Sequence, residues 1–426
     1  KLSGSPPTLH FPSAQQLVCW PDGTLPDAMS GQRWCVVGGG GRGGLLVRTG
    51  KDLSSAPTPT RLSTGAIVKE LERDGDRLHY RRLTGEGPDD GWVSVQVSGR
   101  SLLLPWKDPA ENGAALLEAL RAGQPPRSGP VHGQLEAAVR EAARAIREAD
   151  AILVGTGAGM GVDSGLGTFR GRNAGIWPPL QRLGLEFPQV STPSWFREDP
   201  HFAWAFWWFR YEAYTGCEPH AGYWLLADWG RRKKAGFFSF TSNIDGHWEL
   251  VGAPTYECHG SLRYLQCLQG EACHRACWPA PRDFRLELEE ARDDHVRDPL
   301  PRCPRCGGGA RPAVLMFGDW GYCSPREDEQ SRRYDDFLSG LGSSKLAVVE
   351  IGAGTAVPSV RMACQRESRR AGATLIRINL EDASVPKGGV GLALGALDAL
   401  TLIDEELRRV GWVEAALGGA ASHQGR

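Results

Sequence analysis

The sequence predicts an α/β protein built on a doubly wound parallel sheet, with a smaller cysteine-rich lobe and a preceding small all-β domain. Three observations predict this fold class. An apolar run at 151–154 leads into a glycine-rich segment, GTGAGMGVDSGLGTFRG, at 155–171. Further strand patterns alternate with amphipathic helical patterns, which is typical of a parallel sheet covered by helices. Five cysteines gather between 267 and 306, far from the glycine-rich segment.

The composition indicates a globular chain of two domains. With 426 residues, 41% hydrophobic content and a formal net charge of -1, it can bury a large core. The one compact basic run, 231–234, is interpreted as a solvated helix end, so a nucleic-acid partner is not expected. No apolar run of about eighteen residues predicts a membrane span, and the first residues lack a signal-peptide pattern. Eleven cysteines in a long chain favour a reducing compartment, so the expected location is intracellular, cytoplasmic or nuclear.

The first part of the chain predicts a disordered tail and a small β domain. Residues 1–18 are rich in Pro and Ser and are expected to be disordered. From 19 to 106, short runs such as WCVVGG, GLLVRTG, GAIVKELE and GWVSVQV are separated by turn residues, which is typical of a small barrel or sandwich. The strand order resembles the SH3-like barrels, and the ligand of such a domain is unknown. Trp34, Tyr80 and Trp92 either line a groove or form the core.

A helix and a linker at 107–133 separate this domain from the second one, which spans 134–410. The helix is DPAENGAALLEALR, with an Asp N-cap, and the linker is QPPRSGPVHG. In the second domain an amphipathic helix at 134–148 leads into the strand AILVG. The later strands are FFSFTSN, LAVVEIG and TLIRINL, and the helices between them lie at about 219–234, 358–371 and 395–410. The tryptophan-rich stretch 193–214 and the cysteine region then build the smaller lobe, and 411–426 is a C-terminal tail.

Four more polar or glycine-rich segments lie where predicted strands end. They are TSNIDGH (241–247), CHGS (258–261), FGDW (317–320) and GAGTAVPS (352–359). In an open α/β sheet the carboxyl ends of the strands form the binding crevice, so we expect these segments to surround one ligand. The small residues at 155–159 let the backbone approach a pyrophosphate, with unpaired amides directed at its oxygens. The glycine run at 38–41, in contrast, is interpreted as a loop.

The cysteines predict a closed tetrahedral zinc site. Cys303 and Cys306 form a CPRC pair with regular metal-ligand spacing. The first pair is irregular, because Cys267 and Cys273 are six apart and Cys277 offers a four-residue spacing to Cys273. Four thiolates on two turns leave no open position, so such a site is structural rather than catalytic. The alternative is that these side chains are buried or free thiols.

Taken in order, the five segments and the cysteine module resemble the sirtuins, which are zinc-containing NAD-dependent protein deacylases. The resemblance covers 134–410, with a zinc module at about 262–316. It implies a Rossmann-like sheet, NAD and structural Zn²⁺ as cofactors, and the acylated lysine of a protein or peptide as partner. One branch of the family has a tryptophan shortly after its second cysteine, and Trp278 then marks Cys273 as that ligand. The implied zinc ligands are Cys267, Cys273, Cys303 and Cys306.

The resemblance also implies which residues bind NAD. The glycine-rich segment holds the pyrophosphate, with Arg170 beside it, and Phe169 shields the reactive ribose carbon. The segment at 241–247 faces the nicotinamide side, and the last two strand ends face the adenosine side. The implied cofactor residues are Gly157, Ala158, Gly159, Phe169, Arg170, Ser242, Asn243, Ile244, Asp245, Gly352, Gly354, Thr355, Asn379 and Glu381. The alternatives without a ligand are a core position for Phe169, a simple turn at 243–246 and a solvated Glu381.

His259 is the expected general base. An imidazole that titrates near neutrality can take a proton from a ribose hydroxyl, and Gly260 leaves room for the substrate. In the implied mechanism, the acyl oxygen of the substrate attacks C1′ as nicotinamide leaves. A ribose hydroxyl activated by His259 then captures the acyl group and frees the lysine. The resemblance places Asn243 at the ribose and Asp245 at the carboxamide, so both join the expected catalytic set.

Three residues are assigned to the acylated substrate. Phe317 and Gly318 occupy the family position where an extended peptide pairs as an added strand. Arg210 lies where the sirtuins that take acidic acyl chains have an arginine, although Trp207 stands in place of their tyrosine. Aromatic side chains at this helical spacing are otherwise expected to pack the lobe.

Two other classes of function remain open. The same crevice suits a mono-ADP-ribosyltransferase or NAD hydrolase, and it also suits a non-catalytic module that senses NAD and recruits partners through the β domain. The chain departs from the usual sirtuin pattern at Gly161, Gly167, Ser242 and Asp319. Glycine in place of proline at 167 adds backbone freedom to the cofactor loop, so a reduced NAD affinity is expected.

Overall fold

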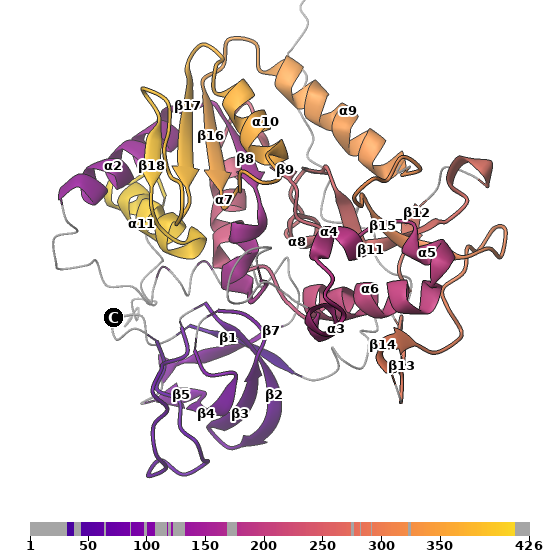
Figure 1. The fold of residues 1–426 in the computed structure, drawn as a ribbon. Helices are drawn as coiled ribbons and strands as arrows, with labels where there is room; N and C mark the ends of the chain where they lie inside the picture. Colours follow the sequence, from indigo (N-terminus) through magenta and orange to yellow (C-terminus); the bar gives the residue numbers. More distant parts are fainter. Residues whose placement is uncertain are drawn as a thin grey trace, which may run out of the picture.

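An all-parallel sheet of six strands forms the body of the molecule (Figure 1). The fold is that of a computed structural model, which describes residues 32–37, 44–63, 65–85, 87–97, 100–106, 117, 121, 133–167, 177–273, 277–281, 283–290, 292–322 and 325–413. The strands are β8 (Ala151–Thr156), β9 (Phe237–Thr241), β10 (Thr255–Glu257), β16 (Leu346–Ile351), β17 (Ala373–Ile378) and β18 (Val390–Leu392). Their order, β10-β9-β8-β16-β17-β18, and their parallel pairing confirm the doubly wound sheet.

Helices cover both faces of this sheet. They are α2 (Gly133–Glu148), α7 (Ala221–Arg231), α9 (Pro325–Gly340), α10 (Ser359–Glu367) and α11 (Ala396–Arg409). The first two and α11 share an apolar cluster with Ile152 and Val154 of β8, whereas α9 and α10 pack with Ala151 and Leu153. Successive strand residues point to opposite faces, so the uninterrupted apolar run of β8 reflects burial on both sides. The expected alternation of strands and helices is confirmed.

The predicted smaller lobe is built from the two insertions. Its helices are α3 (Pro178–Leu183), α4 (Phe187–Val190), α5 (Trp195–Glu198) and α6 (Pro200–Thr215). Its sheets are β12 (Cys277–Pro279), β11 (Gly260–Cys267) and β15 (Ala310–Val314), and the pair β13 (Leu288–Glu289) and β14 (Arg292–Val296), with a turn of 3-10 helix η4 (Gly270–Ala272). Trp204, Trp207 and Trp208 of α6 are all buried in one apolar cluster with β11 and β15. The tryptophans therefore pack the lobe, as their spacing indicates.

The N-terminal strands form a separate antiparallel sheet with its own core. Its order is β4 (Asp90–Ser94), β3 (Arg77–Arg82), β2 (Ile67–Asp74), β1 (Arg33–Val36) and β7 (Leu103–Trp106), with a short pair β5 (Gln96–Val97) and β6 (Arg100–Ser101) beside it. Trp34, Tyr80 and Trp92 are buried, which excludes a groove lined by these rings and makes them core residues. The all-β character is confirmed, and the SH3-like barrel stays a prediction.

The connecting segments are described only in part. The predicted disordered tail at 1–18 lies outside the described residues, as does most of the helix and linker at 107–133 and the chain beyond 413. Two described side chains of the connection contact the body: Leu117 is buried in its core, and Arg121 pairs with Asp228 and Asp404, each at 2.9 Å. Within the described residues, no helix combines the length and the apolar character that a bilayer span needs.

The basic run at 231–234 is a solvated helix end at the end of α7, as interpreted, except at Lys233. Lys233 is buried, and its ammonium group donates hydrogen bonds to the backbone oxygens of Ile146, Arg147 and Ala149, the latter two at 3.2 and 3.0 Å. These carbonyls end α2 and have no partner inside the helix, so the lysine caps it. Burial lowers the pKa of Lys233 to about 8.

Candidate active site

Two glycine loops meet at the centre of the sheet. The chain leaves β8 toward one edge of the sheet and leaves its neighbour β16 toward the other, so a crevice opens where their carboxyl ends lie side by side. A Cβ atom on Gly157 would lie 2.7 Å from the Gly352 oxygen, and one on Gly159 would lie 2.6 Å from the Gly352 Cα. Only glycine permits this contact, which brings both loops to one place as predicted.

The amides of the first loop are used differently from the prediction. The loop continues as a 3-10 helix, η3 (Ala158–Ser164). The Gly157 amide donates to the Ile351 oxygen at 3.0 Å, and the Gly159 amide donates to the Gly352 oxygen at 3.1 Å. These two amides hold the loops together and are not unpaired donors for a phosphate. Ala158, between them, lines the cavity described below. Phe169 and Arg170 lie outside the described residues.

The segment after β9 enters the same crevice. The Asn243 side-chain amide donates to the Gly157 oxygen at 3.0 Å, so it joins the second strand end to the glycine loop. Asp245 is buried, and its carboxylate accepts a hydrogen bond from the His247 amide at 2.9 Å. Arg263 donates to the Asp245 backbone oxygen at 2.9 Å. The segment 243–246 therefore forms a turn and also lines the cavity. The two interpretations of this motif, a simple turn and a ligand-facing segment, are both compatible with the structure.

A cavity of about 240 Å³ joins these residues to the candidate base. It lies between the body and the smaller lobe and is lined by Ala158, Gly161, Leu166, Gly167, Phe187, Ser191, Trp207, Arg210, Tyr214, Ser242, Asn243, Ile244, Asp245, His259, Val314, Leu315, Met316, Phe317 and Val357. It thus brings together residues from the ends of four strands, β8, β9, β10 and β16, and from three lobe segments, α4, α6 and the end of β15. Its wall is mainly apolar with a few polar groups, which is typical of a small-molecule site.

His259 follows β10 and is half-buried in this wall. Its backbone oxygen accepts a hydrogen bond from the Leu315 amide at 3.0 Å, which ties it to the lobe. Its Nε2 lies 3.5 Å from the Ser359 hydroxyl, at the start of α10. Burial lowers the pKa of His259, while a hydrogen bond to the Ser242 main chain acts in the opposite direction. The imidazole is therefore neutral near pH 7 and can accept a proton.

Arg210 and Phe317 form the lobe side of the cavity. Arg210 is buried on α6, and it donates to the Tyr214 hydroxyl at 2.8 Å and lies 5.0 Å from the centre of the Phe187 ring. The Phe317 side chain is exposed and lies edge-on to Phe187, while its amide donates to the Ser191 oxygen at 2.9 Å. Gly318 follows with a left-handed backbone, outside the cavity lining.

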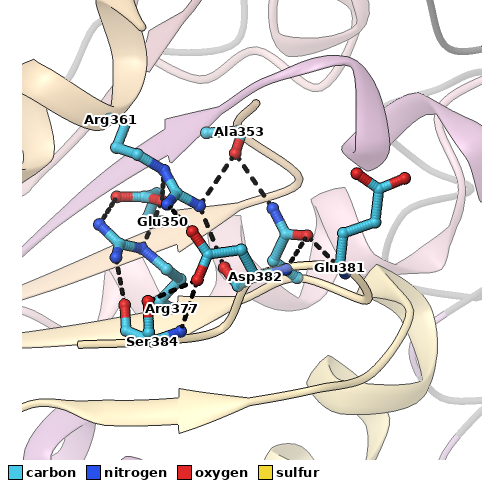
Figure 2. A network of polar contacts seen from close by, with 8 residues as sticks. Glu350, Ala353, Arg361, Arg377, Glu381, Asp382 and Ser384 are labelled. Atoms are coloured by element: carbon cyan, nitrogen blue, oxygen red, sulfur yellow. Dashed lines mark hydrogen bonds and ion pairs between the residues drawn. The ribbon is translucent and has the colours of Figure 1, made fainter. Parts of the chain in front are cut away.

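The remaining predicted cofactor residues lie beyond the cavity. Gly352, Gly354 and Thr355 follow β16, and Asn379 and Glu381 follow β17. The Asn379 amide donates to the Ala353 oxygen at 3.0 Å, and its oxygen accepts from the Glu381 amide at 2.9 Å. Asn379 therefore shapes the loop. The Glu381 carboxylate is exposed and points away from the other side chains in Figure 2.

A buried ionic network that the sequence did not predict lies beneath this loop (Figure 2). Glu350 and Arg377 are opposite each other on β16 and β17, and Arg377 donates to both carboxylate oxygens, at 2.7 and 2.9 Å. Arg361 of α10 donates to the Asp382 carboxylate at 2.5 Å and to its backbone oxygen at 3.0 Å. The network pins the loop after β17 to the loop after β16. A charged residue inside each of two apolar strand patterns was the available signal.

The four predicted zinc ligands come together in the lobe. The sulfur atoms of Cys267, Cys273, Cys303 and Cys306 all lie within 4.8 Å of one another. Cys267 and Cys306 are 3.7 Å apart, and Cys273 and Cys303 are 3.9 Å apart. Tetrahedral zinc with bonds of about 2.3 Å requires sulfur atoms about 3.8 Å apart, so the group fits a structural zinc site. Cys277 is not part of the group, so Cys273 is the second member.

Known proteins are similar in sequence to this chain over the region that contains most of the cavity residues. Residues 157–344 match the Sir2 family. An NAD-dependent protein deacylase of Pseudomonas putida is 31% identical over 276 residues, which cover 61% of this chain and 93% of that protein. An NAD-dependent protein deacylase of Corynebacterium glutamicum is 30% identical over 243 residues, which cover 55% of this chain and 88% of that protein. A solved structure from a study of the mechanism and regulation of Sir2 enzymes has 24% identity and a TM-score of 0.46, and covers 65% of this chain and 99% of its own.

Proposed function

Because this chain belongs to the Sir2 family, we propose that it is an NAD-dependent protein-lysine deacylase. It would transfer the acyl group of a modified lysine to the ribose of NAD, consuming one water and releasing nicotinamide, the free lysine and O-acyl-ADP-ribose. One observation carries this proposal: His259 lines the same cavity as Ala158 of the glycine loop and as Asn243 and Asp245. A proton acceptor in reach of a dinucleotide cradle suits a reaction on the ribose.

The residues of the cavity would divide the work as follows. When bound, NAD supplies an electrophilic ribose carbon with nicotinamide as its leaving group. Asn243 and Asp245 would orient the nicotinamide end, since both are held in place by backbone contacts to Gly157 and His247. His259 in its neutral form would accept the proton of a ribose hydroxyl at Nε2 or pass it toward Ser359. The apolar wall would exclude water from the ribose carbon. This favours attack by the acyl oxygen of the substrate over hydrolysis of NAD.

The acylated lysine would enter from the lobe side. Phe317 lies at the rim of the cavity, where a peptide could contact it. Phe317 and Gly318 form a turn, so the expected pairing of an added strand would have to use the backbone beside them. The lysine would then extend past Met316 and Val314 toward His259, and its acyl group would reach the wall that contains Arg210. Backbone pairing tolerates many sequences, so the acyl group and not the peptide is the main determinant of this part of the site.

We expect Arg210 to favour acyl groups that end in a carboxylate. Its guanidinium lies in the cavity wall among aromatic rings, where a charge-assisted hydrogen bond is strong. Replacement by methionine should lower kcat/KM for a succinyl-lysine peptide by about 10- to 100-fold. The acetyl-lysine peptide serves as the internal control and should lose little. Equal losses on both peptides would mean that Arg210 only supports the lobe.

Product analysis tests the proposed function directly. The full chain is incubated with NAD and an acetyl-lysine peptide, and the products are identified by mass spectrometry. The expected products are the free lysine peptide, nicotinamide and O-acetyl-ADP-ribose in equal amounts. ADP-ribosylated protein without loss of acetyl would identify a mono-ADP-ribosyltransferase instead, free ADP-ribose alone an NAD hydrolase, and binding of NAD without turnover an NAD-sensing module.

The N-terminal sheet fits an SH3-like barrel in its antiparallel order and in the apolar cluster that its own strands enclose. We propose that fold for it, and a cytoplasmic or nuclear location for the chain, because four thiolates poised for zinc persist best where thiols stay reduced.

A further inference from the structure

The N-terminal sheet packs against the body beside the cofactor loop. In Figure 1 this sheet lies below the body, with β1 and β7 on the side nearest to it. Cys35, Ile67 and Trp106 of the sheet belong to the same apolar cluster as α2, α7 and α11. The sheet therefore shares a continuous core with the body and is not a domain joined only by its linker.

A buried ion pair crosses this interface. Arg33 of β1 pairs with Glu218, which lies in the connection between α6 and α7. Both side chains are buried, at 9% and 6% exposure. Burial lowers the pKa of Arg33, since it removes water from the guanidinium. A charge in this position needs its counter-ion, so removal of either partner leaves the other buried and uncompensated.

From Glu218 the contacts lead directly to η3. Two residues further on, the His220 amide donates to the Ser164 hydroxyl at 3.0 Å. The His220 Nδ1 accepts a hydrogen bond from the Gly222 amide at 3.0 Å, so the neutral ring carries its proton on Nε2. Nε2 then donates to the Met160 oxygen at 2.8 Å. The segment that Arg33 holds thus contacts η3 at Met160 and at its last residue, Ser164.

A second contact joins the sheet to η3 without an intermediary. The Gly85 amide, in the connection after β3, donates to the Asp163 backbone oxygen at 2.9 Å. The Asp163 carboxylate accepts from the Leu397 amide of α11 at 2.8 Å. The end of η3 is therefore held between the N-terminal sheet and the body.

We propose that the N-terminal sheet is a positioning element of the NAD site, which acts through Arg33–Glu218 and Gly85–Asp163 to hold η3 in its binding conformation. This inference rests on the proposed function of the 157–167 loop. The loop contains glycine at 157, 159, 161, 165 and 167, so its free form has much conformational freedom to lose when a ligand binds. Contacts that order the loop in advance raise affinity without touching the ligand.

The test compares Arg33→Met with Lys51→Met. Lys51 belongs to the same domain but pairs with Asp74 at an exposed position, so its variant controls for loss of a positive charge. In the protein without ligand, amide hydrogen exchange of the peptide 157–167 should rise in Arg33→Met and stay unchanged in Lys51→Met. ADP-ribose affinity, measured by calorimetry, should fall about fivefold or more in Arg33→Met, with kcat at saturating NAD retained.

Two further variants guard against simple unfolding. Glu218→Gln keeps the shape of the side chain and its ability to accept a hydrogen bond from Arg33. It should show a smaller increase in amide exchange at 157–167 than Arg33→Met. The charge swap Arg33→Glu with Glu218→Arg should restore slow exchange and ADP-ribose affinity. Unchanged exchange at 157–167 in folded Arg33→Met and Glu218→Gln would overturn the proposal. These readouts need no turnover, so a wild-type chain that binds ADP-ribose but deacylates nothing would refute the proposed function alone.

Discussion

Replacing His259 with alanine is expected to lower kcat/KM for deacylation by about 10²- to 10⁴-fold, which is the usual contribution of a general base. The imidazole lines the cavity beside Asn243 and Asp245 and is the proposed proton acceptor. The variant should still bind ADP-ribose, because the glycine loops meet without it. Peptide turnover followed by mass spectrometry measures the first quantity, and calorimetry measures the second. His79→Ala is a suitable control, since that ring stacks on Trp92 in the N-terminal sheet.

The pH dependence should identify the same residue. Burial lowers the pKa of His259 from its ordinary value of 6.5, so the neutral form persists into mildly acid solution. Activity therefore rises with pH through this lowered pKa, and the acid limb of kcat/KM has its midpoint below pH 6.5. The residual activity of His259→Ala should lack this limb. Full activity of the variant, or the same acid limb without the imidazole, would reject His259 as the base.

Replacing Cys303 with serine is expected to release zinc and unfold much of the smaller lobe. The four sulfur atoms join the end of β11 to the turns that precede β15, so the metal closes the loops around the lobe core. Metal binding of this kind is folding free energy. A decrease of about 3 kcal/mol in the free energy of unfolding would lower Tm by roughly 10 °C in a domain of this size. Because the lobe carries Arg210 and Phe317, deacylase activity should fall as well.

Cys277→Ser is the matched control for the zinc site. Cys277 begins β12, only four residues after Cys273, but its sulfur lies outside the four-sulfur group. Its variant should retain one zinc per chain by mass spectrometry and a nearly unchanged Tm, whereas Cys273→Ser should behave like Cys303→Ser. Zinc loss from Cys277→Ser together with retention by Cys273→Ser would exchange the two assignments.

Much of the fold and most of the crevice followed from local pattern. The apolar runs at 151–154 and 346–349 predicted buried strands, since a strand covered on both faces has no polar side. The segments that contain Asn243 and His259 were found because polar residues directly after such strands meet at one edge of a sheet, and the resemblance to the sirtuins selected the two residues within them. The cysteine spacing left Cys273 and Cys277 open on its own, and the sulfur positions separate them.

Where prediction failed, the reason was a contact between distant segments. The Gly157 and Gly159 amides were expected to be unpaired, but they donate to Ile351 and Gly352, nearly two hundred positions away in the chain. Lys233 was expected in solvent and caps α2 instead. Such pairings depend on which loops the sheet order brings together. No local sequence pattern encodes that order.

By itself, the sequence determined the fold class, the glycine loops, the strand-end residues of the crevice and the cysteines that fit zinc. These follow from short-range rules: the period of apolar residues, the turn preferences of glycine, and the spacing of metal ligands. Only the tertiary structure decided which amides remain for a ligand, how Glu350 and Arg377 pair across two strands, and where the N-terminal sheet docks. The physical reason is that a buried charge or amide takes its partner from whatever segment packs beside it, and packing is a property of the whole fold.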